Sequence, residues 1–427
     1  MTVKTSVETE NEVTKNIKIE IPRSTFDEQV AKKLGTVAGR IQLKGFRKGK
    51  VPKNYVGKLY GDELKYDVLN DFVQEHYRTV IDNEKLKIVG FPDLDFDQEA
   101  FKNSTDNIQV TAKVSLFPNP EITNYKGIKI NVELEQVKDE DLESQLKSLQ
   151  STFSTFKELS DRNFVELGDV VKIDYKGSLN GKELADLCGA DIDIELKENS
   201  APEHLINGLI GMQVGSVKEI SLQVPEGIKD DSLVGKTIVY QVTVKAIQEK
   251  VLAELNDELA QKSQKAQTLV ELKKVLREEL ELGVEERNRE LKLNKILEEI
   301  AKANPFLIPQ KLVDEEIRQI LIEWGVFKRD DEKVWTRDVS MFREKLGEQA
   351  EKKVRNYVIL NRVKEVEGLT ATDDDVEAWF DKQTDKFKLE KERLKEYYER
   401  DNDANFAKRI IENNKTIELL IGSAEIN

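Results

Sequence analysis

The spacing of apolar residues changes along the chain, and this change limits the architectures that the sequence can adopt. Apolar and polar residues alternate over residues 13–21 and 108–116, which is typical of half-buried strands. Between these two stretches, apolar residues recur at spacings of three or four, which predicts helices. Strands with helices between them indicate an α+β domain, which we place at residues 1–117.

Residues 161–248 differ in composition and are rich in glycine and β-branched residues. The sequence VVKIDYKGSLNGK predicts a strand, a turn and a second strand, and ISLQV and TIVYQVTVKAI predict further strands. We therefore expect a small, largely antiparallel β domain.

The linker before it, residues 118–160, begins with a proline pair that neither a helix nor a central strand tolerates. It includes one amphipathic helix from Asp139 to about Phe156.

From Val251 to the end of the sequence, apolar residues recur at spacings of three and four in narrow stripes. Narrow stripes favour helices that pack along slender seams. We therefore predict an extended all-α domain with arms over residues 249–427, and a plain helical bundle remains the alternative. The whole chain is predicted to be an α+β multidomain protein.

Local signals predict where some helices begin and end. Ser24 is suited to cap the first helix, and Pro52 suits the first turn of a short helix that ends near Gly61. Thr372 and the three acidic residues after it predict the start of a late helix.

Between two prolines, residues 306–308 are either exposed contacts or part of a loop anchored in the core. The three tryptophans are expected to be packed: Trp324, Trp335 and Trp379.

The composition limits the chemistry that the chain can perform. Charged residues make up 35% of the sequence and hydrophobic residues 38%, which is typical of a heavily solvated, helix-rich protein. Cys188 is the only cysteine, and the two histidines, His76 and His204, are far apart in sequence. We therefore expect no disulfide, no metal site, no cofactor and no histidine-dependent nucleophilic catalysis. An ATP-binding loop ending at Gly235-Lys236-Thr237 is not supported, because Asp230 occupies a position that requires glycine.

The sequence contains no apolar run of about 18 residues, so it predicts no membrane-spanning helix. The first residues also lack the basic start and apolar stretch of a secretion signal. We therefore expect the protein to stay in the cytoplasm.

One segment is strongly basic, although the chain has a net charge of -15. Between Gln29 and Gly61 there are nine basic residues and no acidic residue. Such a run is commonly a solvated face, but it is also typical of a surface that binds an anionic partner. Gly45 and Gly49 bracket Phe46, which predicts a tight exposed turn whose aromatic side chain is available to a partner.

The eight residues GFRKGKVP at 45–52 resemble the signature of the trigger factor family, bacterial chaperones that dock at the ribosomal exit tunnel. The order of a signature-bearing domain, a small β domain and a long helical region is similar to that family over the whole chain. The resemblance implies docking on the large ribosomal subunit, on RNA and a ribosomal protein, and binding of nascent or unfolded polypeptides. It implies these docking residues: Gly45, Phe46, Arg47, Lys48, Gly49 and Lys50. It leaves open whether free molecules form a homodimer.

Residues 161–248 resemble an FK506-binding-protein (FKBP) type prolyl isomerase, the domain that trigger factors have at this position. Such a domain surrounds an X-Pro bond with apolar and aromatic walls and needs neither nucleophile nor metal. The resemblance places Tyr175 and Tyr240 at aromatic positions of the pocket, and Leu184, Ile192 and Leu205 at positions where the family has aromatic residues. We therefore expect the fold with weak or absent turnover. The two tyrosines could equally be core aromatics of a β domain.

Three functions are consistent with these features. The leading hypothesis is an ATP-independent, ribosome-associated chaperone. The alternative is a cytosolic prolyl isomerase whose flanking regions recruit substrate, which activity of the middle domain would favour. An RNA-binding protein that uses the basic segment directly is a third hypothesis, and the acidic composition disfavours it.

Overall fold

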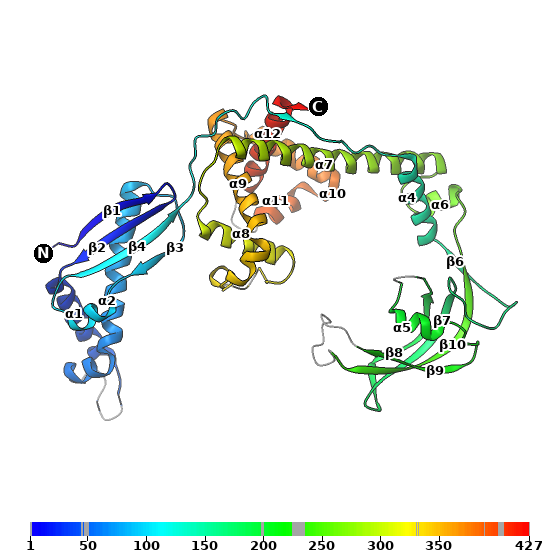
Figure 1. Ribbon diagram of the computed structural model, residues 1–427, viewed down its shortest axis with the longest axis horizontal. Coiled ribbons are helices and arrows are strands. Elements are labelled where there is room, and N and C mark those ends of the chain that lie inside the picture. Colours follow the sequence, from blue (N-terminus) through cyan, green and yellow to red (C-terminus); the bar gives the residue numbers. More distant parts are fainter. Residues whose placement is uncertain are drawn as a thin grey trace. The chain divides into compact units, whose positions relative to one another are not determined.

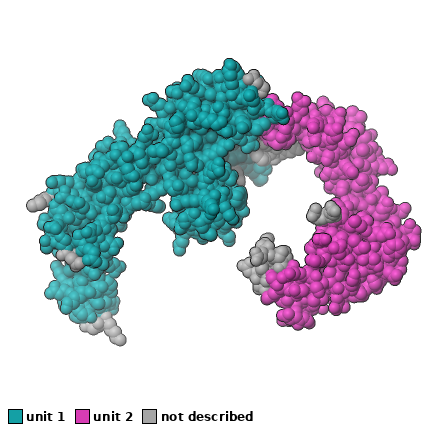
Figure 2. All heavy atoms as spheres, viewed as in Figure 1, with its two compact units in different colours: residues 1–133, 289–427 teal, residues 134–288 magenta. Residues whose placement is uncertain are grey.

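The computed structural model describes residues 2–43, 46, 51–197, 200–223, 235–329, 331, 333–387, 389–399 and 405–426. The chain divides into two compact units, which Figure 2 distinguishes by colour. Unit 1 contains residues 1–133 and 289–427, and unit 2 contains residues 134–288. The predicted domain boundaries after residues 117, 160 and 248 stay predictions, because a compact unit can contain more than one domain.

A four-stranded antiparallel sheet begins unit 1, with its strands in the order β1-β2-β4-β3 (Figure 1). The strands are β1 (Lys4–Asn11), β2 (Thr14–Ile21), β3 (Ile88–Asp95) and β4 (Ile108–Leu116). One face of β2 and β4 is buried, which confirms the predicted alternation. The buried residues of that face are Ile17, Ile19, Ile21, Ile108, Val110, Ala112 and Val114.

Three helices contribute to the core on this face: α1 (Arg23–Arg40), α2 (Lys53–Glu84) and α3 (Gln98–Asn103). The prediction of a short helix ending near Gly61 was wrong, because α2 has 32 residues and runs through this glycine. Glycine in a helix interior costs about 1 kcal/mol relative to alanine. The buried stripe of Val56, Leu64 and Val68 continues across Gly61 and outweighs that cost.

The start of α1 also differs from the prediction. The helix begins at Arg23, Pro22 occupies the capping position, and no side chain caps the helix, so Ser24 is not the cap. The Arg23 guanidinium donates hydrogen bonds to the carbonyl oxygens of Phe101 and Ser104, at 3.1 and 2.9 Å. These contacts with the end of α3 join the start of α1 to a segment far away in the sequence, which local sequence signals do not report.

Unit 2 contains a five-stranded antiparallel sheet in the order β6-β10-β7-β8, with β9 also paired to β10 (Figure 1). The strands are β6 (Thr155–Glu158), β7 (Val170–Leu179), β8 (Lys182–Glu195), β9 (Val217–Gln223) and β10 (Thr237–Val251). The predicted strand, turn and strand are confirmed, because Asn180 and Gly181 join β7 to β8 with φ values of 52° and 79°. The helix α5 (Glu203–Leu209) contributes Ile206 and Leu209 to the core of this sheet.

Unit 2 also contains α4 (Asp139–Thr152), α6 (Asp257–Lys262) and the first part of α7 (Leu269–Ala303), which continues into unit 1. These helices share one apolar cluster, whose buried members are Leu146, Ala260, Leu272 and Leu276. The end predicted for α4 near Phe156 was wrong, because Phe156 belongs to β6.

The rest of unit 1 is helical, as predicted, apart from one short strand pair. Its helices are α8 (Gln310–Glu323), α9 (Arg343–Glu367), α10 (Asp373–Phe387), α11 (Lys391–Glu399) and α12 (Phe406–Ser423). Two 3₁₀ turns, η1 (Val334–Thr336) and η2 (Ser340–Phe342), precede α9. The strands β5 (Lys129–Ile130) and β11 (Glu425–Ile426) pair in parallel. Among the described helices, none has both the length and the apolar character that crossing a membrane requires.

The predicted start of α10 is confirmed. The hydroxyl oxygen of Thr372 accepts a hydrogen bond from the Asp375 backbone N–H at 3.2 Å, and the Asp375 carboxylate accepts one from the Thr372 backbone N–H at 2.8 Å. The Lys415 ammonium donates to the same carboxylate at 2.7 Å. Lys415 and the Thr372 bonds together lower the pKa of Asp375 to about 2.

Candidate functional sites

The basic segment lies between α1 and α2, and Phe46 is the one predicted docking residue that the structure describes. Five other predicted docking residues lie outside the described residues: Gly45, Arg47, Lys48, Gly49 and Lys50.

Phe46 is half-buried instead of fully exposed. Its side chain packs against a cluster whose buried members are Ala38, Val51 and Val56. Its ring centroid lies 5.3 Å from that of Tyr55 on α2. Tyr55 itself is 46% exposed and Leu59, one turn further along α2, is 54% exposed. The apolar surface beside the basic segment therefore includes part of α2, which the expectation of a single exposed aromatic did not include.

Unit 2 contains a cavity of about 580 Å³. Four of the five predicted pocket residues line it: Tyr175, Ile192, Leu205 and Tyr240. Leu184 is not among the described residues that line this cavity. It lies near the β7–β8 turn, where Glu183 pairs with Ser178, whereas Ile192 pairs with Ile173 further along the sheet.

The pocket prediction also omitted four branched aliphatic residues that line the cavity: Ile173, Ile194, Leu222 and Val242. Strand periodicity could have identified three of them, because residues two apart in a strand face the same side. Ile194 is two residues from Ile192. Ile173 is two residues from Tyr175, and Val242 is two residues from Tyr240. The cavity surface is thus mainly aliphatic, with aromatic side chains from β7 and β10.

The two tyrosines form an edge-to-face pair. Their ring centroids are 5.9 Å apart and the ring planes meet at 67°. Burial raises the pKa of Tyr240, and the nearby Tyr175 raises it further. The Tyr240 hydroxyl is therefore neutral at physiological pH and can donate a hydrogen bond. Both rings also pack against the buried core of the β domain, so each is a core aromatic and a cavity wall at once.

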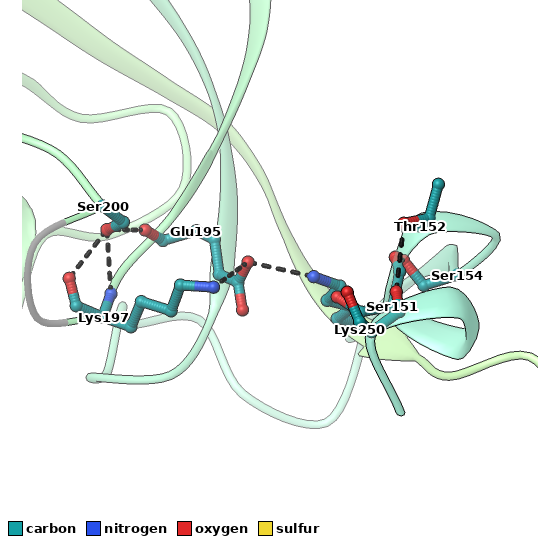
Figure 3. A network of polar contacts seen from close by, with 8 residues as sticks. Ser151, Thr152, Ser154, Glu195, Lys197, Ser200 and Lys250 are labelled. Carbon is teal, nitrogen blue, oxygen red and sulfur yellow. Dashed lines mark hydrogen bonds and ion pairs between the residues drawn. The ribbon is translucent and has the colours of Figure 1, made fainter. Parts of the chain in front are cut away.

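The rim of the cavity is charged, and its charges are paired (Figure 3). The Glu195 carboxylate accepts hydrogen bonds from the ammonium groups of Lys197, at 3.1 Å, and Lys250, at 3.0 Å. Burial opposes ionisation of Glu195, but the two ammonium groups outweigh it and lower the pKa of the carboxyl group. The Ser200 hydroxyl oxygen lies 2.7 Å from the Lys197 carbonyl oxygen and fixes this part of the rim.

This arrangement provides a cavity with mainly aliphatic and aromatic walls and a charged rim. In the part of the chain that the structure describes, no group of three His, Cys, Asp or Glu side chains could hold a metal ion. Rotation about an X-Pro bond needs no nucleophile or metal. It needs a site with little water. The twisted amide is less dipolar than the planar one, so it loses less solvation free energy when it enters such a site.

The residues considered as exposed contacts in the helical region have different surroundings. Phe306 and Ile308 pack against apolar clusters, whereas Leu307 is 52% exposed. The Arg355 guanidinium lies 5.0 Å from the centre of the Phe306 ring and donates to the Phe306 carbonyl oxygen. The interpretation of a loop anchored in the core is therefore confirmed for two of the three residues.

The prediction of packed tryptophans is confirmed for Trp379, which contacts Phe380 and Tyr398. It was wrong for Trp324 and Trp335, which are 61% and 44% exposed. Trp324 follows the last residue of α8, and Trp335 lies in the short 3₁₀ turn η1.

Three family models match consecutive parts of the chain. The model described as bacterial trigger factor protein matches residues 3–149. The model of FKBP-type peptidyl-prolyl cis-trans isomerase matches residues 161–245. The model described as the C-terminus of bacterial trigger factor protein matches residues 268–422.

Curated relatives match nearly the whole length. Trigger factor of Caldicellulosiruptor bescii is 30% identical over 419 residues, which cover 96% of this chain and 94% of the relative. Trigger factor of Desulforudis audaxviator is 28% identical with the same coverage of both chains. A solved structure from work on promiscuous substrate recognition by the trigger factor chaperone is 18% identical, with a TM-score of 0.48. It covers 98% of this chain and 99% of that chain.

Proposed function

This chain belongs to the trigger factor family of chaperones, and we propose that it works without ATP, docks on the large ribosomal subunit near the exit tunnel and binds nascent polypeptides there. The observation that supports docking is the sequence GFRKGKVP at residues 45–52, inside the part that the bacterial trigger factor model matches. A site of action beside the ribosome also places the protein in the cytoplasm. Dimerisation of free molecules is a separate question that sedimentation at several protein concentrations would answer.

The proposed docking residues differ in the contacts that they can make. Arg47 can bind a phosphate or carboxylate through two parallel hydrogen bonds, whereas Lys48 acts as a point charge. Phe46 supplies apolar surface, and its packing on Tyr55 limits the positions of its ring. The flanking Gly45 and Gly49, with Lys50, complete the proposed site. Contacts with RNA phosphates release counterions, so affinity for the ribosome should fall steeply as salt rises.

Cosedimentation with empty and translating ribosomes across a salt series tests this proposal. The variant with Phe46, Arg47 and Lys48 all changed to alanine should no longer pellet with ribosomes. A matched control changes Phe91, Arg78 and Lys87, three exposed residues of the same types outside the basic segment, to alanine. This control should pellet like the unchanged protein. Equal pelleting of both variants would remove the docking proposal.

We also propose that the FKBP-type domain has weak or no isomerase turnover. Leu205 and Ile192 line the cavity at positions where the resemblance leads us to expect aromatic side chains, so the prolyl ring meets fewer aromatic walls. An isomerisation assay of the full chain on a Leu-Pro tetrapeptide tests this. We expect a slow rate that rises when Leu205 is changed to tryptophan. A rate equal to that of an ordinary FKBP enzyme would contradict the proposal.

Prolyl isomerisation as the main activity is the second candidate, and the cavity of about 580 Å³ between Tyr175, Tyr240 and Leu205 is the observation that favours it. A refolding assay with a substrate limited by proline isomerisation separates the two functions. If isomerisation is the main activity, changing Tyr240 to alanine abolishes assistance, and the docking variant has no effect on it. An aggregation assay with a proline-free substrate gives the opposite test. If chaperone binding is the main activity, the Tyr240→Ala variant and the docking variant both protect this substrate from aggregation.

A further inference from the structure

Each of the two cavity tyrosines lies opposite a glycine on the neighbouring strand. Tyr175 on β7 pairs with Gly189 on β8, and Tyr240 on β10 pairs with Gly177 on β7. Directly opposed residues of antiparallel strands have their side-chain positions on the same face of the sheet, at close range. Each tyrosine ring can therefore lie over the backbone of its partner glycine.

The space above each glycine is filled by a neighbouring side chain. A Cβ atom at Gly189 would lie 2.6, 2.7 and 2.9 Å from the Cε1, Cζ and Oη atoms of Tyr175. A Cβ atom at Gly177 would lie 3.0 Å from Cε1 of Tyr240 and 2.7 Å from Cβ of Leu187. Contacts shorter than 3.0 Å are essentially never found around real Cβ atoms, so a side chain at position 189 forces the Tyr175 ring to move.

Backbone conformation does not explain these two glycines. The described glycines with positive φ do not include Gly177 or Gly189, so an alanine could adopt either backbone conformation. Glycine within a strand otherwise weakens the strand, and it often marks a place where another group approaches closely. The group that approaches Gly189 is the cavity wall itself.

We propose that Gly189 and Gly177 are positioning residues that set the orientation of the Tyr175 and Tyr240 rings and so define the walls of the prolyl-peptide cavity. This inference rests on the proposed role of the cavity in binding X-Pro segments. Neither glycine touches the peptide; each acts through the ring that covers it. Gly189 gives the cleaner test, because the three atoms nearest to its added methyl group all belong to the Tyr175 side chain, whereas two of the three nearest at Gly177 belong to Leu187.

The first experiment measures binding of the tetrapeptide Ala-Leu-Pro-Phe to the full chain by titration calorimetry. We expect Gly189→Ala to weaken binding about threefold to tenfold, because the ring must leave its preferred rotamer. In a Tyr175→Leu background the same change should have no further effect. Gly283→Ala is the matched control, because its added methyl meets only the end of the Arg287 side chain, at 3.6 Å. Unchanged binding by Gly189→Ala, or equal weakening in both backgrounds, would overturn the inference.

A second experiment does not depend on peptide binding. NMR of the full chain with ring-labelled tyrosine should give cross-peaks between the Tyr175 ring and the Gly189 α-protons, and between the two tyrosine rings. Gly189→Ala should remove the cross-peaks between the rings while leaving the far-UV circular dichroism unchanged. If the unchanged protein binds no peptide but shows this ring displacement, the proposed role of the cavity in binding X-Pro segments fails and the positioning role stands. Ring cross-peaks that survive in Gly189→Ala would exclude the positioning role.

Discussion

The sheet of unit 1 and the sheet of unit 2 have the same kind of strand pattern but different coverings. The buried face of the first sheet packs against α1, α3 and the 32-residue helix α2. In the second sheet the corresponding helix is α5, with seven residues, and a cavity of about 580 Å³ remains beside it. Alternation of apolar residues therefore tells which face of a strand is covered, but not how completely it is covered.

The two sheets also obtain their aromatic side chains from different elements. In the first, Phe26 from α1 and Phe101 from α3 meet edge to face, with ring centroids 5.6 Å apart. In the second, Tyr175 and Tyr240 come from the strands themselves and are 5.9 Å apart. In the first sheet, the rings from the helices fill the core. In the second, each ring from a strand lies across the neighbouring strand and needs space there. The glycines opposite the two tyrosines provide that space.

The largest effect is expected for the filled core. Phe26 is fully buried, and changing it to alanine should destabilise the first sheet by about 3–5 kcal/mol, because the covering helices cannot close the hole. Hydrogen exchange of the β2 and β4 amides measures this local loss. Phe91→Ala is the matched control, because Phe91 lies on β3 of the same sheet and is 77% exposed. It should change the exchange free energy by about 0.5 kcal/mol or less. Similar effects of the two substitutions would show that the first core is not tightly filled.

A matched pair of isoleucines compares the sheets directly. Ile19→Ala in β2 removes a fully covered side chain and should cost about 2–5 kcal/mol. Ile192→Ala in β8 enlarges an existing cavity by a side chain that is already 40% exposed, and it should cost about 1 kcal/mol or less. Hydrogen exchange of β2 and β8 amides in the two variants gives both values. A cost at Ile192 as large as that at Ile19 would mean that the cavity closes in solution.

The sequence predicted the parts of the fold that depend on local periodicity. The strands β2 and β4 followed from alternation, and β7 and β10 from β-branched residues and a turn signal. The start of α10 followed from Thr372 and its acidic neighbours. Contacts between distant segments could not be predicted in this way. The prediction of a helix end near Gly61 was wrong, because the burial of Leu64 and Val68 that continues α2 is a tertiary property.

The candidate sites depended on resemblance more than on pattern. Four pocket residues meet at one cavity, although Leu205 is on α5 and the others are on three separate strands. The β7–β8 pairing is irregular between Ile173 and Tyr175 and again between Lys176 and Ser178. Such irregularities change which β8 residues lie beside the cavity, and no local signal around Leu184 reports them. The half-buried state of Phe46 likewise depends on α2, through Tyr55.

The smallest effect is expected from ionisation of one phenol in each region. Burial raises the pKa of Tyr77, which packs against the core of the first sheet, and it raises the pKa of Tyr240 in the second. An unfolded tyrosine has a pKa of about 10. Because each folded pKa lies above that value, the neutral phenol contributes stability that is fully present below about pH 10 and is lost as the pH rises through the folded pKa. Phenylalanine at either position should remove that part of the alkaline loss, as measured by hydrogen exchange of the local amides between pH 9 and 11.

The raised pKa values of Tyr77 and Tyr240 have different causes, and a third variant tests this difference. Burial is the only cause of the raised pKa of Tyr77, whereas Tyr175 adds to the effect of burial at Tyr240. Tyr175→Phe keeps a ring beside Tyr240 but removes the second ionisable hydroxyl. Ultraviolet difference titration against Tyr240→Phe and Tyr77→Phe should therefore show Tyr240 ionising at lower pH in Tyr175→Phe, with Tyr77 unchanged. An unchanged Tyr240 titration would mean that the two rings do not stay together at high pH, and that the strand-supplied aromatic wall is looser than the helix-supplied one.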